Sequence, residues 1–141
     1  MKIIFLCAAN VFRSQIAEAV FNKICKENNL KHKARSAALI YNNEPMHLLV
    51  IKALKEIGIN ISKNKSKRAT PELIENSDLI ILMHSNLKGH LINILHKPVE
   101  IWNIEDIHAW EDEFEKYPDI VKTRNQIQNK ISELLKTLED K

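Results

Sequence analysis

Cysteine is scarce in this sequence, and long apolar runs are missing from it. The 141 residues include two cysteines, Cys7 and Cys25, too few for the disulfide framework of a small secreted domain. No stretch approaches the roughly eighteen apolar residues of a membrane-spanning helix. The first residues, Met1 and Lys2, lead into an apolar run without the pattern of a cleavable signal peptide. We therefore expect a cytoplasmic protein with no membrane partner.

A large charge imbalance is also absent. The 21 lysines and arginines only slightly exceed the 18 aspartates and glutamates, and the net charge of +3 is too small to indicate a nucleic-acid partner. The local basic run formed by Lys63, Lys65, Lys67 and Arg68 is either a solvated loop or a surface that steers phosphorylated substrates. The six histidines lack the spacing of metal ligands. We predict neither a metal site nor any other cofactor.

Strand and helix patterns alternate along the chain without a repeat, a low-complexity segment or a long linker. This alternation is typical of one α/β domain, here residues 1–141. Short apolar and β-branched runs predict four strands, at Lys2–Leu6, Lys33–Ala37, Asp78–Met83 and Val99–Trp102.

Helix signals fall between and after these runs. Thr70 followed by Pro71 is typical of an N-cap and a first helical turn, and Gly58 is typical of a helix end. Four other helices are predicted. One starts at Ser14, a second covers Met46–Ile57, a third is capped by Ser85, and the last covers Pro118–Leu138.

The turn from Cys7 to Ser14, between the first strand and the first helix, carries the chemistry. Backbone N–H groups of such a turn lack intrahelical partners and form, with the helix dipole, a concave site for a tetrahedral oxyanion. The same positive potential favours a nucleophilic thiolate at Cys7, and the Arg13 guanidinium can bind two phosphoryl oxygens. A buried structural thiol and an ordinary surface ion pair are the alternatives for these two residues.

The pattern C-x-x-N-x-x-R-S, from Cys7 to Ser14, resembles the active-site loop of low-molecular-weight protein tyrosine phosphatases and thioredoxin-coupled arsenate reductases. Further segments resemble this family in the same order, so the similarity covers nearly the whole chain. They are Arg35–Ala38, Ile51–Ser62, Ser77–Met83 and Ile104–Asp106. The resemblance implies a doubly wound, four-stranded parallel sheet of order 2-1-3-4, with helices on both faces and the loop at the carboxyl ends of the central strands.

The resemblance also implies roles within the loop. Cys7 would attack phosphorus, and Arg13 would bind the equatorial oxygens. Ser14 would either cap the helix or donate to the thiolate, and both can hold at once. Asn10 is expected in a left-handed conformation that shapes the loop, with Ser36 as a hydrogen-bond partner. The residues assigned to phosphate binding are Ala8, Ala9, Asn10, Val11, Phe12 and Ser14.

A general acid must protonate the leaving oxygen, and the resemblance implies Asp106. Ile107 replaces the proline that normally follows this aspartate, so Glu105 is a rival if the loop is shifted by one residue.

Several other residues depart from the family's pattern. Ala9 occupies a position that is usually glycine, which would cost roughly 1–2 kcal/mol if φ were positive there. Asn64 replaces a histidine that supports the loop asparagine, and Phe12 replaces the second loop cysteine of many phosphatases. The tyrosines that usually follow the acid are absent, so Tyr41 and Trp110 are the candidate pocket walls.

We interpret the chain as a phosphatase that hydrolyses phosphotyrosine or related phosphomonoesters through a phosphocysteine intermediate, on a phosphorylated protein or a small phosphoester. Removal of phosphate from arginine by the same loop is an alternative. An arsenate reductase of this family would need two further cysteines near residues 82–89, which hold none. Cys25 lies roughly 16 Å along the first helix from Ser14, so a reductase would depend on external thiols. A phosphate-binding or phosphoprotein-binding module with little turnover is the other alternative.

Overall fold

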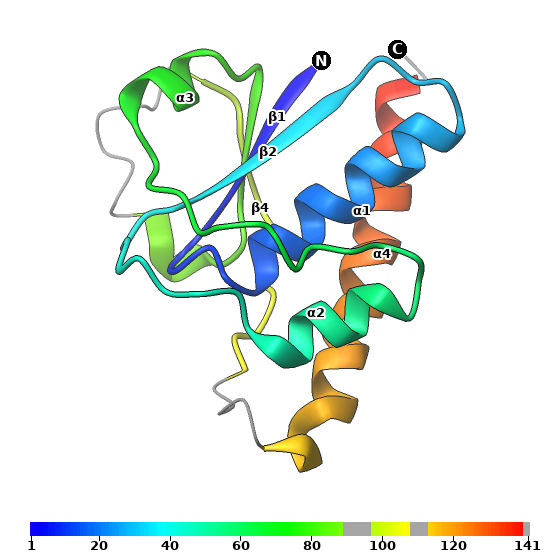
Figure 1. Ribbon diagram of the computed structural model, residues 1–141. Helices are drawn as coiled ribbons and strands as arrows, with labels where there is room; N and C mark the ends of the chain where they lie inside the picture. Colours follow the sequence, from blue (N-terminus) through cyan, green and yellow to red (C-terminus); the bar gives the residue numbers. More distant parts are fainter. Residues whose placement is uncertain (89–96, 108–112, 140–141) are drawn as a thin grey trace.

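The computed structural model of the chain describes residues 1–88, 97–107 and 113–139 (Figure 1). In chain order its elements are β1 (Lys2–Cys7), α1 (Arg13–Glu27), β2 (Lys33–Ala38), α2 (Leu48–Lys55), α3 (Pro71–Glu75), β3 (Leu79–Leu82), β4 (Val99–Ile101), a 3-10 helix (Phe114–Lys116) and α4 (Tyr117–Glu139). The four predicted strands are confirmed to within one residue at each end. Among the described residues, no helix is both long enough and apolar enough to cross a membrane.

The four strands form one parallel sheet of order β2-β1-β3-β4. Ile3 of β1 pairs with Ala34 of β2 on one side and with Leu79 of β3 on the other. This confirms the predicted α/β fold and strand order. The first crossover, β1-α1-β2, runs outward from the centre of the sheet, and the chain then returns to β3 on the other side of β1. The carboxyl ends of β1 and β3 therefore meet where the strand order reverses, which is where ligands bind in such sheets.

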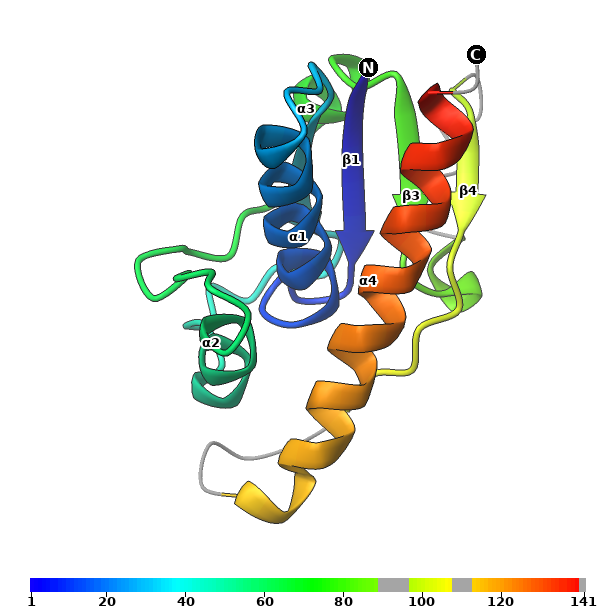
Figure 2. The ribbon, with the colours of Figure 1, turned by 90° about the vertical axis from the view of Figure 1, so that its right-hand side faces the viewer.

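Alternate residues of the central strands bury two separate apolar clusters, one on each face of the sheet. Ile3 and Phe5 belong to the larger cluster, which includes residues of α1, α2 and α4. Ile4 and Leu6 belong to the smaller cluster with Ile74 of α3. Figure 1 shows α1 and α4 on one side of the strands and α3 on the other, and Figure 2 looks onto the side that carries α1 and α4. Helices thus cover both faces, as predicted.

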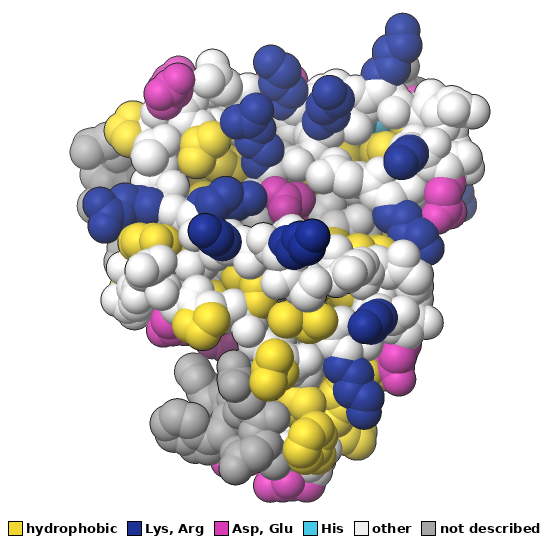
Figure 3. All heavy atoms as spheres, in the orientation of Figure 1, with side chains coloured by type: hydrophobic (Ala, Val, Ile, Leu, Met, Phe, Trp, Pro, Cys, Tyr) yellow, Lys and Arg dark blue, Asp and Glu magenta, His cyan; other side chains and the backbone are white. Residues whose placement is uncertain are grey.

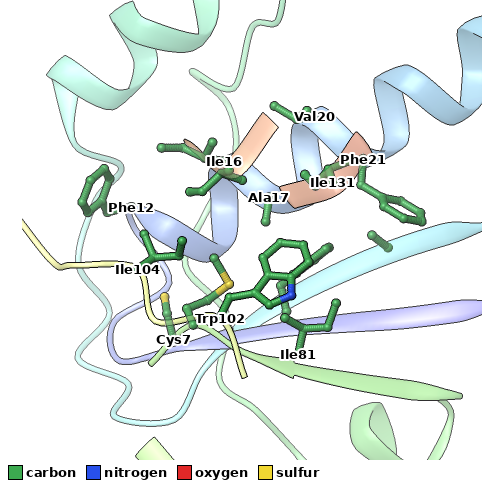
Figure 4. Packing of buried hydrophobic residues seen from close by; sticks show 14 of the residues in the cluster. Cys7, Phe12, Ile16, Ala17, Val20, Phe21, Ile81, Trp102, Ile104 and Ile131 are labelled. Atoms are coloured by element: carbon green, nitrogen blue, oxygen red, sulfur yellow. The ribbon is translucent and has the colours of Figure 1, made fainter. Parts of the chain in front are cut away.

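Aromatic side chains fill the centre of the larger cluster. The ring centroids of Phe5 and Trp102 lie 5.5 Å apart, and those of Phe5 and Phe21 lie 6.1 Å apart in an edge-to-face arrangement. Figure 4 shows Trp102 between the sheet and α1, with Cys7 towards one end of the cluster and Phe21 towards the other. The apolar core therefore extends to Cys7, at the carboxyl end of β1.

Side-chain caps explain where two helices begin. The Thr70 hydroxyl accepts from the Leu73 amide at 3.2 Å with Pro71 in the first turn, which confirms the predicted start of α3. The His47 Nδ1 accepts from the Leu49 amide at 3.1 Å, so α2 begins at Leu48, two residues later than predicted.

Two other details of the helices bear on the sequence predictions. Gly58 follows the last turn of α2 with φ +83, the left-handed conformation expected of a terminating glycine. The prediction that Ser85 caps a helix was wrong. A 3-10 turn covers residues 85–88, and the Asn86 amide donates to the His84 imidazole, while the Ser85 amide donates to Asn103.

The segment after residue 60 returns to the edge strand β2 and continues the sheet near the Cys7 loop. The Ala38 amide donates to the Lys67 carbonyl at 2.6 Å, and the Ala69 amide donates to the Ala38 carbonyl at 2.8 Å. Farther back along β2, the Asn22 carboxamide of α1 pairs with both backbone groups of Ala34, at 2.9 and 3.0 Å. This pairing satisfies edge groups that would otherwise be open to another strand.

A polar cluster joins α2 to α4. Glu56 accepts from the Tyr117 hydroxyl at 2.7 Å and from Arg124 at 3.2 Å, and Arg124 also donates to the Ala53 carbonyl at 2.7 Å. The bond from Tyr117, helped by Arg124, holds the pKa of Glu56 below its ordinary value. Burial, together with the bond to Glu56, raises the pKa of Tyr117 to about 12. These contacts fix the relative positions of two helices that contribute walls to the pocket described next.

Candidate active site

Cys7 ends β1 and lies at the base of a pocket of about 290 Å³. Its side chain is 2% exposed. The Cys7 Sγ lies 2.8 Å from the Ser14 Oγ and accepts from the Asn10 amide at 3.3 Å. Of the two roles considered for Ser14, the N-cap is wrong, because α1 begins at Arg13 with no side-chain cap. The Ser14 hydroxyl faces the sulfur instead.

Asn10 gives the loop its shape. Its φ of +59 is left-handed, as predicted, and its side chain is fully buried. Its Oδ1 accepts from the Lys67 amide at 2.9 Å and from the Gln15 Nε2 at 3.1 Å, and its Nδ2 donates to the Ser14 Oγ at 2.7 Å. Ala9 does not have a positive φ, so alanine adds none of the strain considered for that position.

Backbone N–H groups of the loop lack protein acceptors. Within the described part of the chain, the amides of Ala9, Val11 and Phe12 donate to no acceptor. The pocket is lined by the whole run from Cys7 to Arg13, directly before the first turn of α1. Several free donors around one hollow at a helix N-terminus bind an anion.

Arg13 is 5% exposed and is held along one edge of its guanidinium. Its Nη1 donates to the Ile104 carbonyl at 2.9 Å and to the Met83 carbonyl at 3.4 Å. Its Nε is buried and has no partner among the described residues, while its Nη2 lies 3.7 Å from the Asp106 Oδ2. The Nε and Nη2 edge, the edge that binds oxyanions in a bidentate manner, therefore has no hydrogen-bond acceptor among the described residues.

Asp106 is on the segment that follows β4, and it lines the same pocket as Cys7 and Arg13. Its side chain is 36% exposed, so the carboxyl group can reach a substrate and solvent. Glu105 is exposed and lies outside the lining of this pocket. The structure thus brings Asp106, rather than its neighbour, to the anion site.

Two supporting residues are placed differently from the prediction. Ser36 does not bond to Asn10, because the Asn10 carboxamide is already bonded to Ser14, Gln15 and Lys67. The Ser36 Oγ is buried without a partner among the described residues. Asn64 does not reach Asn10 either.

Gln15 is the site residue that the sequence analysis missed. The Asn64 Nδ2 donates to the Gln15 Oε1 at 3.2 Å, and Gln15 in turn donates to Asn10. The sequence did hold a signal for this role, because Gln15 is a polar residue that directly follows Ser14 and precedes the apolar residues of α1.

The pocket walls also differ from those predicted. The Tyr41 hydroxyl donates to Asn43 at 2.8 Å, and its ring lies under the Arg68 guanidinium at 5.1 Å. Tyr41 is not among the lining residues of the described pocket, and Trp110 lies outside the described residues. The walls beyond the loop are Glu44, His47, Val50, Asp106, Ile107 and Ile120.

Basic side chains gather on the surface over β2 and the segment after residue 60. Figure 3 shows lysine and arginine side chains gathered over β2 and the segment after residue 60, with apolar side chains below them over α2. Two members of the basic run have partners, because Lys67 pairs with Glu18 at 3.2 Å and Arg68 stacks on Tyr41. Across the part of the chain that the structure describes, no group of three or more His, Cys, Asp or Glu residues could hold a metal ion.

Comparison with known proteins defines the family. Residues 2–141 match the family model described as low molecular weight phosphotyrosine protein phosphatase. The chain belongs to this family. The structure is similar to that of a low molecular weight protein tyrosine phosphatase from T. tengcongensis. The TM-score is 0.85 and the identity 25%, and the match covers 97% of this chain and 99% of that one.

Relatives of this phosphatase family member differ in activity. An arsenate reductase of Bacillus subtilis is 28% identical over 137 residues, which cover 96% of this chain and 95% of the reductase. A protein-arginine-phosphatase of the same organism is 36% identical over 84 residues, 59% of this chain and 55% of the relative. Members of the family are therefore enzymes, either phosphatases or arsenate reductases.

Proposed function

We propose that this protein is a cysteine-dependent phosphatase that hydrolyses phosphotyrosine or related aryl phosphomonoesters. The observation that carries the proposal is the incomplete hydrogen bonding of Arg13. Its Nε–H is buried without an acceptor among the described residues, and Arg13 lines the pocket of Cys7. Leaving a buried charged donor unsatisfied is unfavourable, and a phosphoryl group seated over Cys7 would satisfy it.

In the first step the Cys7 thiolate attacks phosphorus, and an S–P bond forms as the ester P–O bond breaks. The loop N–H groups and Arg13 stabilise the charge on the equatorial oxygens. Asp106 donates its proton to the departing oxygen, because a protonated phenol leaves more readily than a phenolate. The products are the alcohol or phenol and a phosphocysteine.

In the second step the Asp106 carboxylate takes a proton from water as the water oxygen attacks phosphorus. The S–P bond breaks, inorganic phosphate leaves, and the Cys7 thiolate is restored. The Ser14 Oγ at 2.8 Å and the Asn10 amide at 3.3 Å are positioned to stabilise that thiolate as the leaving group. The cycle is complete with groups of this chain, water and substrate.

The walls above the anion site support an aryl substrate. Val50, Ile107 and Ile120 line the pocket together with Phe12 of the loop, and apolar walls of this kind favour a flat hydrophobic ring. Glu44 also lines the pocket, so a cationic substrate group would meet a carboxylate there. Phosphotyrosine and phosphoarginine are therefore compared directly in the test below.

Cysteine placement supports hydrolysis over a thiol relay. The second cysteine, Cys25, is buried near the far end of α1, and its burial raises the pKa of its thiol. A buried, neutral thiol is a poor nucleophile, so Cys25 is poorly suited to attack Cys7 and form a disulfide with it. Arsenate reductase remains the second candidate because curated reductases match almost the full length of the chain.

The test is a substrate panel measured with a chelator present. We expect turnover of phenyl phosphate and phosphotyrosine, a lower kcat/KM for phosphoserine, and no turnover by Cys7→Ser, which should still bind vanadate. Phosphoarginine and arsenate with glutathione or thioredoxin are the comparison reactions. Full activity of Cys7→Ser would refute the covalent mechanism, and arsenate-dependent thiol oxidation without ester hydrolysis would assign the chain to the reductases.

A further inference from the structure

The fully buried Gln15 side chain connects the Cys7 loop to the segment that follows residue 62. Its Nε2 donates to the Asn10 Oδ1 at 3.1 Å and to the Lys65 carbonyl at 3.2 Å, and its Oε1 accepts from Asn64 at 3.2 Å. Both ends of the carboxamide are thus occupied. Gln15 makes no hydrogen bond to Cys7 within the described residues, yet it bonds to Asn10, the residue that shapes the loop.

The bonds to Asn10 set the direction of a chain of hydrogen bonds that ends on sulfur. Because Gln15 and the Lys67 amide both donate to the Asn10 Oδ1, the Asn10 Nδ2 must face the Ser14 Oγ, to which it donates at 2.7 Å. The Ser14 oxygen accepts this bond and lies 2.8 Å from the Cys7 Sγ, and because a thiolate can only accept, the Ser14 hydroxyl is the donor to the ionised sulfur.

We propose that Gln15 is a positioning residue that fixes the orientation of the Asn10 carboxamide and so directs the Ser14 hydroxyl towards the Cys7 thiolate. The catalytic consequence of this inference rests on the proposed function. Its effect on the sulfur itself does not, because thiolate reactivity can be measured without turnover.

The Lys67 amide alone does not replace Gln15. Lys67 lies on an exposed segment, and Gln15 also anchors that segment through the Lys65 carbonyl and Asn64. Loss of the Gln15 side chain therefore removes one of the two donors to the Asn10 Oδ1, together with the bonds to the Lys65 carbonyl and Asn64, and leaves the Lys67 amide as the other donor. With one donor to its Oδ1 removed, the Asn10 carboxamide is held less firmly, which would leave the Ser14 hydroxyl freer to turn away from sulfur.

The test is the pH profile of iodoacetamide alkylation at Cys7, followed by mass spectrometry of the Cys7 peptide. In Gln15→Met, which retains the approximate volume, we expect alkylation at mildly acidic pH to slow by about tenfold, because a hydrogen bond to a charged group is among the stronger ones. The rates should converge with wild type at alkaline pH. Gln15→Glu should show a larger shift, since a carboxylate accepts from Asn10 and would reverse its carboxamide.

Asn22→Leu is the matched control. It also removes a carboxamide on α1 that bonds to β2, but within the described residues the Asn22 side chain makes no hydrogen bond to Asn10 or Cys7. Its alkylation profile should overlay that of wild type, even where its melting temperature falls.

Asn64→Leu provides a second test if Gln15→Met does not fold, because Asn64 is exposed and its side chain donates to the Gln15 Oε1. It should shift the profile in the same direction by a smaller amount. An unchanged profile in Gln15→Met, or in Asn64→Leu and Gln15→Glu together, would overturn the inference. So would an equal shift in Asn22→Leu. A shifted profile in a chain that hydrolyses no ester would instead contradict the proposed function alone.

Discussion

Two buried arginines, one beside the Cys7 loop and one between α2 and α4, use the same side chain in different ways. Arg124 is 8% exposed and Arg13 is 5% exposed. Each nitrogen of the Arg124 guanidinium donates to an acceptor on Ala53, Glu56 or Asn125. Arg13 donates through Nη1 alone and leaves a buried Nε without a partner in the described part of the chain.

This difference separates a structural arginine from a binding one. A buried guanidinium with all its donors satisfied stabilises the packing of the helices around it. A buried guanidinium with an open edge is held in place by the fold and completed by a ligand. The Arg124 region should therefore govern stability, and the Arg13 region should govern turnover.

The strongest test of this separation exchanges each arginine for lysine. Arg13→Lys keeps the charge but loses the planar two-donor edge, so kcat/KM for phenyl phosphate should fall by about 100-fold or more. Arg124→Lys should leave kcat/KM within a few fold of wild type. Steady-state kinetics on both variants gives the comparison. Wild-type kinetics in Arg13→Lys would place the anion site elsewhere.

The second prediction concerns the carboxylate beside Arg13. Asp106→Asn should slow hydrolysis of phenyl phosphate by about 100-fold or more, and that of an activated nitrophenyl ester by less, because a good leaving group needs less protonation. The dependence of rate on leaving-group pKa should therefore steepen. Glu105→Gln is the control and should retain the wild-type slope. The reverse result would assign the acid to Glu105 and indicate a loop shifted by one residue.

The third prediction returns to Arg124 and measures stability. Arg124→Lys cannot reproduce the bonds to Ala53 and Glu56 together, so the free energy of unfolding should fall by about 1 kcal/mol. Urea denaturation of this variant and of Arg13→Lys tests the contrast. A larger loss of stability in Arg13→Lys would mean that Arg13 is mainly structural.

The smallest expected effect is a pH dependence of the α2–α4 cluster. The pKa of Tyr117 is raised to about 12. The stability that this residue contributes is therefore fully present below its ordinary pKa of about 10 and is lost as pH rises through 12. Glu56 has a lowered pKa, so its contribution is present above its unfolded pKa and is lost as pH falls through the folded one.

Tyr117→Phe should flatten both changes relative to wild type. Urea unfolding at a series of alkaline and acidic pH values would measure them. Parallel curves for the two proteins would show that Tyr117 and Glu56 are not coupled in solution.

Most features that follow from local patterns were predicted from the sequence, although the caps at Ser14 and Ser85 were not correct. The strands, the sheet order, the Thr70 cap and the left-handed Asn10 all depend on periodicity, turn chemistry or the quoted family motif. These features can be predicted without knowing which distant side chains meet in the folded protein. The approach of Cys7, Arg13 and Asp106 to one pocket follows from strand ends that meet at one edge of a parallel sheet.

The features that depend on distant side chains were not predicted. Gln15 bonds to residues about fifty positions away, and Ser36 loses its expected role because Gln15 and Lys67 occupy the Asn10 oxygen. His47 caps α2 through an imidazole, which the helix-start rules did not anticipate. Such pairings are decided by the tertiary fold, since several residues compete for the same buried polar atom.

The central claim is that Cys7 carries the phosphoryl group between the two steps, and rapid quenching tests it most directly. Asp106→Asn should be mixed with an activated aryl phosphate, quenched in acid within one turnover and examined by peptide mass spectrometry. Because Asp106 also activates water, the variant should accumulate a phosphoryl group on Cys7, together with a stoichiometric burst of phenol. Steady release of phosphate with no adduct on Cys7, or an adduct on another residue, would contradict the phosphocysteine mechanism.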